Sequence, residues 1–150
     1  MNRVWTPYVT VAALIERDGR FLLVEEEAED GLRFNQPAGH LDEGESLVAA
    51  CAREALEETA WGFTPTALVG IYQWPRPQGD ITYLRFAFCG DLGAHEAGRA
   101  LDTGILRAVW KTPDEIRASA DRHRSPLVSQ CVSDYLAGRR YPLELIRHYD

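Results

Sequence analysis

Runs of apolar residues alternate along the chain with short polar segments rich in glycine and proline, a pattern that predicts strands joined by turns. Tyr8 to Glu16 is rich in Val, Ala, Leu and Ile, and Arg17-Asp18-Gly19-Arg20 is typical of a turn into a returning strand, Phe21 to Glu26. Further strands are predicted at residues 66–74, 81–89 and 105–111. The proline- and glycine-containing loop 75–80 joins the first two of these as a hairpin.

One long segment has helical spacing instead. A helix is predicted to run to about Thr59, with Ser46 as its N-cap after a tight turn at Gly44. Its packing face is predicted to consist of Val48, Ala52, Ala55, Leu56 and Thr59.

Two shorter helices follow, one with Thr112 and Pro113 at its start and one running from Ser125-Pro126 to about Leu136. Residues 90–104 are predicted to form an irregular functional loop, and residues 141–146 a last strand or an ordered extension. Strands alternating with helices that can cover two faces predict an α/β fold, an α/β/α sandwich on a mixed sheet. We expect residues 1–150 to form a single domain.

Acidic residues concentrate on another face of the long helix. Glu54, Glu57 and Glu58 stand at i, i+3 and i+4, so their carboxylates gather together. A hard divalent cation takes oxygen ligands and would relieve their repulsion. A solvated acidic face, with Arg53 reaching Glu57 one turn on, accounts for the same pattern.

Composition narrows the classes of partner. Lys and Arg number 16 against 23 Asp and Glu, a net charge of −7, which argues against a broad basic surface for a nucleic acid polymer. A small phosphorylated substrate remains compatible with this charge, because a bound metal neutralises both partners locally. The cysteines, Cys51, Cys89 and Cys131, form no C-x-x-C pair, so a reducing cytoplasm is expected rather than a disulfide framework. No apolar stretch approaches the roughly 20 residues of a membrane span, and the N-terminus lacks the apolar run of a signal peptide.

The acidic helix belongs to a longer spaced motif. In the pattern G-x5-E-x7-R-E-U-x-E-E-x-G-U, U is a bulky apolar residue. Six of its fixed positions are met, by Gly39, Glu45, Arg53, Glu54, Glu57 and Glu58. It resembles the Nudix box, the signature of a family of hydrolases that cleave nucleoside diphosphates linked to another group. Ala55 is small where a bulky residue is usual, and Ala60 stands where a glycine usually ends the helix. Gly62 follows two residues later, so we expect the stop to be displaced.

The resemblance implies a Nudix fold and a site that uses Mg2+ or Mn2+. The implied metal shell consists of Glu54, Glu57, Glu58 and the carbonyl of Ala38. Glu54, Glu57 and Arg53 are the implied catalytic residues, and Glu45 and Gly39 would hold the geometry of the motif. Glu54 would be a ligand or the general base; Asp102 and Glu96 on a later loop are alternative bases.

Substrate contacts are less specific in the sequence. Arg33, His40, Arg85 and Arg124 are candidates for binding phosphate, although an ordinary loop, strand or helix-flanking position explains each of them equally well. Tyr72, Trp74, Tyr83 and Phe86 are either core residues or a platform on which a base stacks. The acidic run at residues 25–29 is predicted to be a solvated loop.

Four further segments, residues 35–41, 84–86, 124–128 and 140–144, are similar to phosphatases of this family. This similarity implies hydrolysis of hydroxymethylpyrimidine pyrophosphate and of nucleoside di- and triphosphates, with release of orthophosphate. One alternative is a hydrolase of nucleotide sugars or dinucleoside polyphosphates that releases nucleoside monophosphate. Another is a non-catalytic nucleotide sensor, which the retention of all the box carboxylates disfavours. A monomer or a homodimer is expected, without a nucleic acid or membrane partner.

Overall fold

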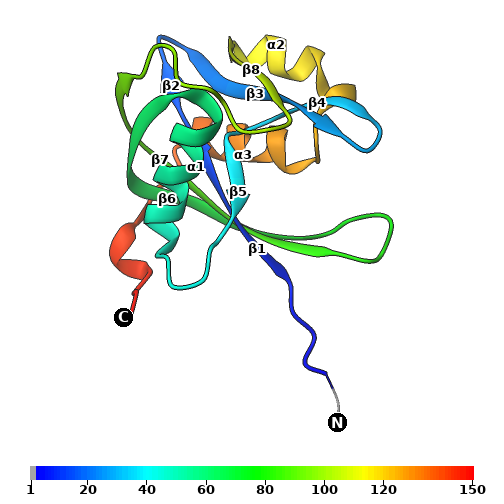
Figure 1. The fold of residues 1–150 in the computed structure, drawn as a ribbon, viewed down its shortest axis with the longest axis vertical. Coiled ribbons are helices and arrows are strands. Elements are labelled where there is room, and N and C mark those ends of the chain that lie inside the picture. The colour runs from blue at the N-terminus through cyan, green and yellow to red at the C-terminus, as the bar shows by residue number, and fades with distance from the viewer. Residues whose placement is uncertain (1–2) are drawn as a thin grey trace.

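The computed structural model describes residues 3–150, and Figure 1 shows the course of the chain. The elements of the N-terminal half are β1 (Tyr8–Leu14), β2 (Glu16–Arg17), β3 (Arg20–Ala28), β4 (Gly31–Asn35), β5 (Ala38–His40), α1 (Leu47–Thr59) and β6 (Trp61–Pro75). Those of the C-terminal half are β7 (Thr82–His95), β8 (Ile105–Lys111), α2 (Pro113–Ala118), η1 (Ala120–Arg122), α3 (Leu127–Leu136), β9 (Tyr141–Pro142) and η2 (Leu143–Leu145). None of the helices within residues 3–150 is both long and apolar enough to cross a membrane.

The strands form two sheets. The five-stranded sheet has the order β5-β1-β7-β6-β9, in which β1 and β7 are parallel and the other neighbours antiparallel. In the second sheet β3 pairs antiparallel with β2, β4 and β8. The far end of the β6–β7 hairpin extends well beyond the helices in Figure 1.

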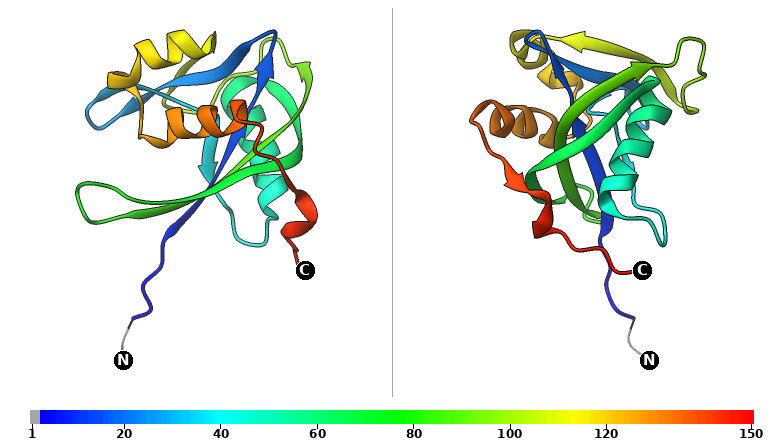
Figure 2. Two further views of the ribbon diagram at one scale, coloured as in Figure 1. Left: turned by 180° about the vertical axis from the view of Figure 1, so that it is seen from behind. Right: turned by 90° about the vertical axis from the view of Figure 1, so that its left-hand side faces the viewer.

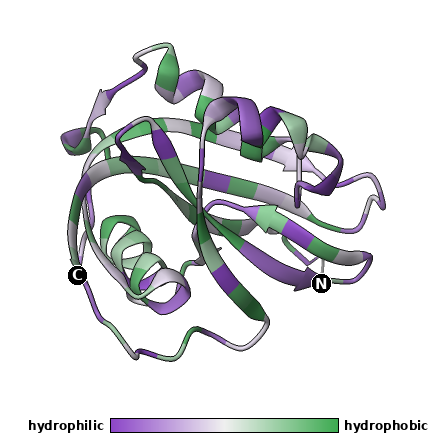
Figure 3. Cartoon of the chain, turned by 90° about the horizontal axis from the view of Figure 1, so that it is seen from above, coloured by the Kyte–Doolittle hydropathy of each residue, from purple (hydrophilic) through white to green (hydrophobic). Residues whose placement is uncertain are grey.

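Helices cover both faces of the five-stranded sheet, as the right-hand view of Figure 2 shows, with α1 on one side and α3 on the other. Successive residues of a strand point to opposite faces. Val11, Ala13 and Phe88 therefore pack with Ala50, Cys51 and Ala55 of α1, whereas Ala12 and Ala87 belong to the cluster that contains Cys131 and Val132 of α3. Figure 3 shows the alternation of hydrophobic and hydrophilic residues along the strands. The predicted α/β/α fold is confirmed.

Helix α1 begins at the predicted cap and ends at Thr59 as predicted, but the residue that forms its stop is not the expected one. The Ser46 hydroxyl accepts a hydrogen bond from the Ala49 N–H at 3.0 Å. Ala60 itself takes the left-handed conformation, with φ 64°, and its N–H donates to the Leu56 carbonyl. The expected displacement of the stop to Gly62 is therefore wrong, since Gly62 lies in β6. The chain accepts a left-handed alanine at a cost of about 1–2 kcal/mol.

The buried face of α1 is rotated from the predicted one. Val48, Ala52 and Leu56 are only half-buried. The buried positions are Ala50, Cys51, Glu54, Ala55, Glu58 and Thr59. The carboxylates of Glu54 and Glu58 thus lie on the buried side of the helix, which the spacing of apolar residues does not predict.

Three further expectations are corrected. The acidic segment 25–29 is not simply a solvated loop, because β3 continues to Ala28 and turns into β4. The first six residues of the predicted irregular stretch 90–104 are strand, since β7 pairs with β6 as far as His95. Strand β5 was not predicted, because its conformation depends on pairing with β1, a contact across residues far apart in sequence.

Glu25 explains why the acidic segment is ordered. Its side chain is buried, and its carboxylate accepts hydrogen bonds from Arg107 on β8, at 2.9 Å, and from Arg122 on η1. These two guanidinium groups hold the pKa of Glu25 below its ordinary value. The carboxylate joins β3 to β8 and to the segment that precedes α3.

We therefore expect Glu25→Gln to lower the free energy of unfolding by about 1–2 kcal/mol, because charge-assisted hydrogen bonds are lost. The matched control is Glu27→Gln, an exposed position on the same strand, which should change stability little. A group with a lowered folded pKa contributes stability above its unfolded pKa, which it loses as the pH falls through the folded value. The difference between wild type and Glu25→Gln should thus shrink below about pH 4 in urea unfolding curves. An equal effect of both variants would contradict this role for Glu25.

Candidate active site

A cleft of about 1050 Å³ opens between the β6–β7 hairpin, the β3–β4 connection and the segment before α3. Its acidic lining includes Glu26, Glu54 and Glu58. Its cationic and aromatic lining includes Arg85, Arg124, Trp74, Tyr83, His40 and His123. The cleft therefore brings carboxylates from α1 into the same space as arginines and aromatic rings from other elements.

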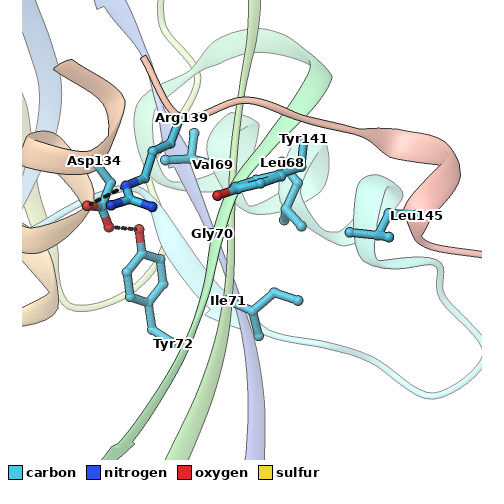
Figure 4. A pocket seen from close by; sticks show the side chains of 9 residues that line it. All are labelled: Leu68, Val69, Gly70, Ile71, Tyr72, Asp134, Arg139, Tyr141 and Leu145. Atoms are coloured by element: carbon cyan, nitrogen blue, oxygen red, sulfur yellow. Dashed lines mark hydrogen bonds and ion pairs between the residues drawn. The ribbon is translucent and has the colours of Figure 1, made fainter. Parts of the chain in front are cut away.

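A second pocket of about 330 Å³ lies beside β6 near the C-terminal segment (Figure 4). Its lining is largely apolar, and the Tyr72 hydroxyl in it donates to Asp134 at 2.7 Å. Arg139 forms an ion pair with the same carboxylate at 3.4 Å. Its acidic group is thus already paired, so the larger cleft is the better candidate for the site.

Three carboxylates meet beside the cleft, and one of them, Glu54, belongs to its lining. Oxygen atoms of Glu54, Glu57 and Asp102 lie within 4.8 Å of one another. Asp102 comes from the loop after β7, and its N–H donates to the Glu57 carbonyl at 3.0 Å, which fixes this loop on α1. Of the two loop acids considered as bases, Asp102 therefore lies in the carboxylate cluster, whereas Glu96 forms an ion pair with Arg99 at 2.9 Å.

Arg53 holds the acidic residues of the motif in place. Its Nε and Nη2 donate to the two oxygens of Glu45 at 2.7 and 3.0 Å, a bidentate pair. Its Nη1 donates to Glu54 at 2.8 Å and to Glu57 at 3.2 Å, and Nη2 also reaches the His40 carbonyl at 3.1 Å. The guanidinium thereby lowers the pKa of Glu45 and ties α1 to the turn before it.

Glu58 lies apart from this cluster and points toward β5. Its carboxylate accepts a hydrogen bond from the Ala38 N–H at 2.9 Å. Burial is the main cause that raises its pKa to about 8, and the nearby charges of Glu26, Glu54 and Asp102 act in the same direction. Glu58 is therefore a buried acid held by the backbone N–H of Ala38, the residue whose carbonyl the resemblance to the Nudix box implies for the metal shell.

Glu54 depends on the absence of a side chain at Gly39. A Cβ atom built on Gly39 would lie 2.1 Å from the Glu54 carboxyl carbon. Burial is the largest influence on this carboxyl and raises its pKa, while Arg53 acts in the opposite direction. The absence of a side chain at Gly39 thus makes room for the Glu54 carboxylate of the same protein, and not for a ligand.

The candidate substrate contacts divide into two groups. Arg85, Arg124 and His40 line the cleft, and Arg124 forms an ion pair with Glu26 at 2.8 Å. Arg33 is not among the lining residues; it pairs with Asp30 at 2.7 Å and donates to the Asp121 carbonyl at 2.7 Å. The structure thus does not bring Arg33 together with the other three.

Sequence reasoning overlooked Glu26 and Asn35. Glu26 lies in the acidic segment interpreted as a loop, yet it lines the cleft and accepts a hydrogen bond from the Asn35 amide at 3.3 Å. Alternation along the predicted strand 21–26 already places Glu25 and Glu26 on opposite faces, and this was the signal available in the sequence.

Comparison with known proteins identifies this arrangement. The NUDIX domain family matches residues 5–131 of the chain. The chain belongs to the Nudix family. It is 38% identical to the phosphatase NudJ of Escherichia coli (strain K12) over 147 residues, which cover 98% of this chain and 95% of that protein. The chain is a Nudix hydrolase similar to NudJ.

Solved structures agree with this assignment. A NUDIX hydrolase from Nitrosomonas europaea is 52% identical, has a TM-score of 0.93, and is matched over 96% of this chain and 98% of its own. A MutT NUDIX hydrolase from Burkholderia pseudomallei, 18% identical, shows the same fold with a TM-score of 0.74, over 87% of this chain and 98% of its own.

The donor set fits a divalent cation of the kind that Nudix hydrolases generally use. Glu54, Glu57 and Asp102 offer hard carboxylate oxygens close together, the ligands that Mg2+ and Ca2+ prefer over nitrogen and sulfur. Their mutual repulsion is only partly relieved by Arg53. The acidic cluster is therefore able to hold a metal ion.

The contact between Gly39 and Glu54 gives a direct prediction. In Gly39→Ala the new methyl group would displace the Glu54 carboxylate, so we expect kcat to fall on the order of 10²-fold. The free energy of unfolding should change by only about 1 kcal/mol, because the displaced group is the end of a flexible side chain. The control is Gly62→Ala in β6, where a Cβ would lie 3.5 Å from its nearest neighbour. Full activity of Gly39→Ala would show that the position of Glu54 is unimportant.

Proposed function

We propose that the protein hydrolyses phosphoanhydride bonds in small pyrophosphorylated compounds and releases orthophosphate. The proposed substrates are a pyrimidine pyrophosphate of the thiamine-precursor type and nucleoside di- and triphosphates. The observation that carries this proposal is the similarity to a phosphatase over 98% of the chain, combined with a carboxylate cluster at the end of a large cleft. We place this activity in a single domain formed by the whole chain.

The proposed metal site consists of Glu54, Glu57 and Asp102, with Glu58 and the Ala38 carbonyl beside it. A divalent cation there, Mg2+ or Mn2+, would neutralise phosphate charge and lower the pKa of a bound water. Asp102 is added as the third carboxylate of the cluster. Glu58 stays beside it, because the Ala38 N–H uses only its Oε1 and a carboxylate has a second oxygen that can bind a cation.

The chain's own residues supply positioning and proton transfer. Arg53 keeps Glu54 and Glu57 at fixed places through its hydrogen bonds to both. Glu54 is proposed as a metal ligand or the general base, because it is the carboxylate of the cluster that also lines the cleft. Glu45 positions Arg53 and does not contact the substrate.

The cations of the cleft are proposed to bind the phosphate chain and the rest of the substrate. Arg124 is 44% exposed and has Glu26 as its ion-pair partner, so its guanidinium is accessible from the cleft. His40 follows Gly39 on β5, which places it beside the carboxylate cluster. Arg33 has no part in this proposal.

The decisive experiment identifies the products from a set of substrates in the presence of Mg2+. Orthophosphate should form from hydroxymethylpyrimidine pyrophosphate and from nucleoside diphosphates, detected by phosphate assay and by chromatography of the organic product. A nucleotide sugar and a dinucleoside polyphosphate should react much more slowly. Exclusive release of nucleoside monophosphate from either of these would replace the proposal with the alternative hydrolase, and binding without turnover would indicate a sensor.

Two isosteric variants test the carboxylates. We expect Glu57→Gln and Glu58→Gln each to lower kcat on the order of 10²-fold or more at saturating Mg2+. Folding should survive, since the amide oxygen that Glu58→Gln introduces can still accept the Ala38 N–H and a carboxylate repulsion is removed. Glu43→Gln, an exposed position outside the cleft, is the control. Near-normal rates in both variants would refute the assignment of this motif to catalysis.

A further inference from the structure

Arg85 is a buried cation without a carboxylate partner. It lies on the central strand β7, is 6% exposed and lines the cleft. Its Nη1 donates to Gln36 Oε1 at 2.8 Å and contacts Cys131 Sγ at 3.7 Å, and its Nη2 donates to Asn35 Oδ1 at 2.9 Å. Within residues 3–150 these partners are all neutral. A buried charge is costly unless it is compensated, so this position calls for a role beyond packing.

The two amides hold the guanidinium in one orientation. Gln36 donates its own N–H to the Val128 carbonyl at 2.8 Å, and Asn35 donates to Glu26 at 3.3 Å. Both amide oxygens are thereby directed at Arg85. A guanidinium carries five N–H groups, of which three are used, so the Nε–H and one Nη2–H meet no acceptor among the described residues. The result is a fixed, charged pair of donors at the cleft.

An aromatic surface adjoins these donors. Tyr83 lies two residues before Arg85, on the same face of β7, and its ring stacks with Trp74 of β6 at a centroid distance of 6.1 Å and an angle of 16°. Both rings line the cleft. Residues two apart in a strand are separated by about 7 Å. A heteroaromatic ring that lies against Tyr83 would therefore present its edge to Arg85.

The strand register leads from Arg85 to the carboxylates. Arg85 pairs with Thr10 of β1, and Thr10 pairs with His40 of β5, next to Gly39. Two strand spacings of about 4.8 Å separate Arg85 from His40 along this row. That length suits a substrate whose ring lies at Arg85 while its phosphates extend toward Glu54.

We propose that Arg85 selects substrates by donating two hydrogen bonds to neighbouring acceptors on the edge of a heteroaromatic ring. Cytosine offers O2 and N3, and guanine offers O6 and N7, whereas uracil and adenine place a donor beside each such acceptor. Among nucleotides of the same phosphate length, those of cytosine and guanine are therefore preferred over those of uracil and adenine. The aminopyrimidine of the proposed thiamine precursor, whose amino group lies beside N3, would accept one of the two hydrogen bonds. This inference rests on the proposed function, because it assigns the ring end of the same cleft.

The test compares kcat/KM for CDP, GDP, UDP and ADP with that for 5-phosphoribosyl pyrophosphate, which has a pyrophosphate and no base. Wild type should prefer CDP and GDP roughly 10-fold, the discrimination expected of a bidentate arginine contact. The preference should fall to within about 3-fold in Arg85→Gln and in Arg85→Lys, which keeps the charge and loses the fork. For 5-phosphoribosyl pyrophosphate, kcat/KM should change little, and by the same amount, in both variants. Arg117→Gln, a 66% exposed arginine side chain on α2, is the control.

Ratios measured on one protein preparation do not depend on its folded fraction, so partial unfolding of a variant leaves the test intact. A wild type without preference, or an Arg85→Gln variant that loses the base-free compound as strongly as CDP, would overturn the inference and leave the proposed hydrolysis standing. Absence of all phosphoanhydride hydrolysis would instead overturn the proposed function. In that case the role of Arg85 is still tested by measuring the affinities of metal-free protein for CMP and UMP through tryptophan fluorescence. Wild type should bind CMP roughly 10-fold more tightly than UMP. Equal affinities would refute the inference.

Discussion

The contact of two α1 carboxylates with the backbone of β5 fixes the position of the acidic residues that the proposed chemistry uses. Glu58 accepts the Ala38 N–H, and Glu54 occupies the space above Gly39 that any larger residue would fill. Because β5 pairs with β1 at the edge of the mixed sheet, these contacts fix the helix relative to the strands that form the cleft. The helix therefore carries its acidic residues to the end of the cleft without relying on a flexible loop.

This arrangement costs stability and is compensated locally. Glu54 and Glu58 are both nearly buried, and burial raises both pKa values. Arg53 offsets part of the repulsion by contacting Glu45, Glu54 and Glu57 at once. The same inner positions of an ordinary amphipathic helix would be apolar. The rotated face of α1 thus reflects a site built into the core, as functional sites often sacrifice packing.

Local features were predictable from the sequence, and long-range ones were not. The cap at Ser46, strand β8 and the closeness of Glu54 to Glu57 follow from spacing within a few residues. Glu58 was predicted to join them and instead accepts the Ala38 N–H on β5. Strand β5 and the approach of Asp102 to Glu57 depend on contacts between distant segments, for which periodicity carries no signal. At Ala60 a local rule gave the wrong prediction. The preference of helix ends for glycine predicted a stop at Gly62, whereas Ala60 itself takes the left-handed conformation in the folded protein.

The two ends of the cleft differ in how far family membership explains them. The acidic end consists mainly of residues of one motif, and its spacing is the same evidence that identifies the Nudix family. The opposite end is assembled from β4, β6, β7 and α3, through Asn35, Trp74, Tyr83, Arg85 and the carbonyl of Val128. None of these residues belongs to the motif, and only strand register and helix packing bring them together. On the proposed function, substrate choice would reside in these tertiary contacts, and the motif would identify the bond that is cleaved and not the molecule that carries it.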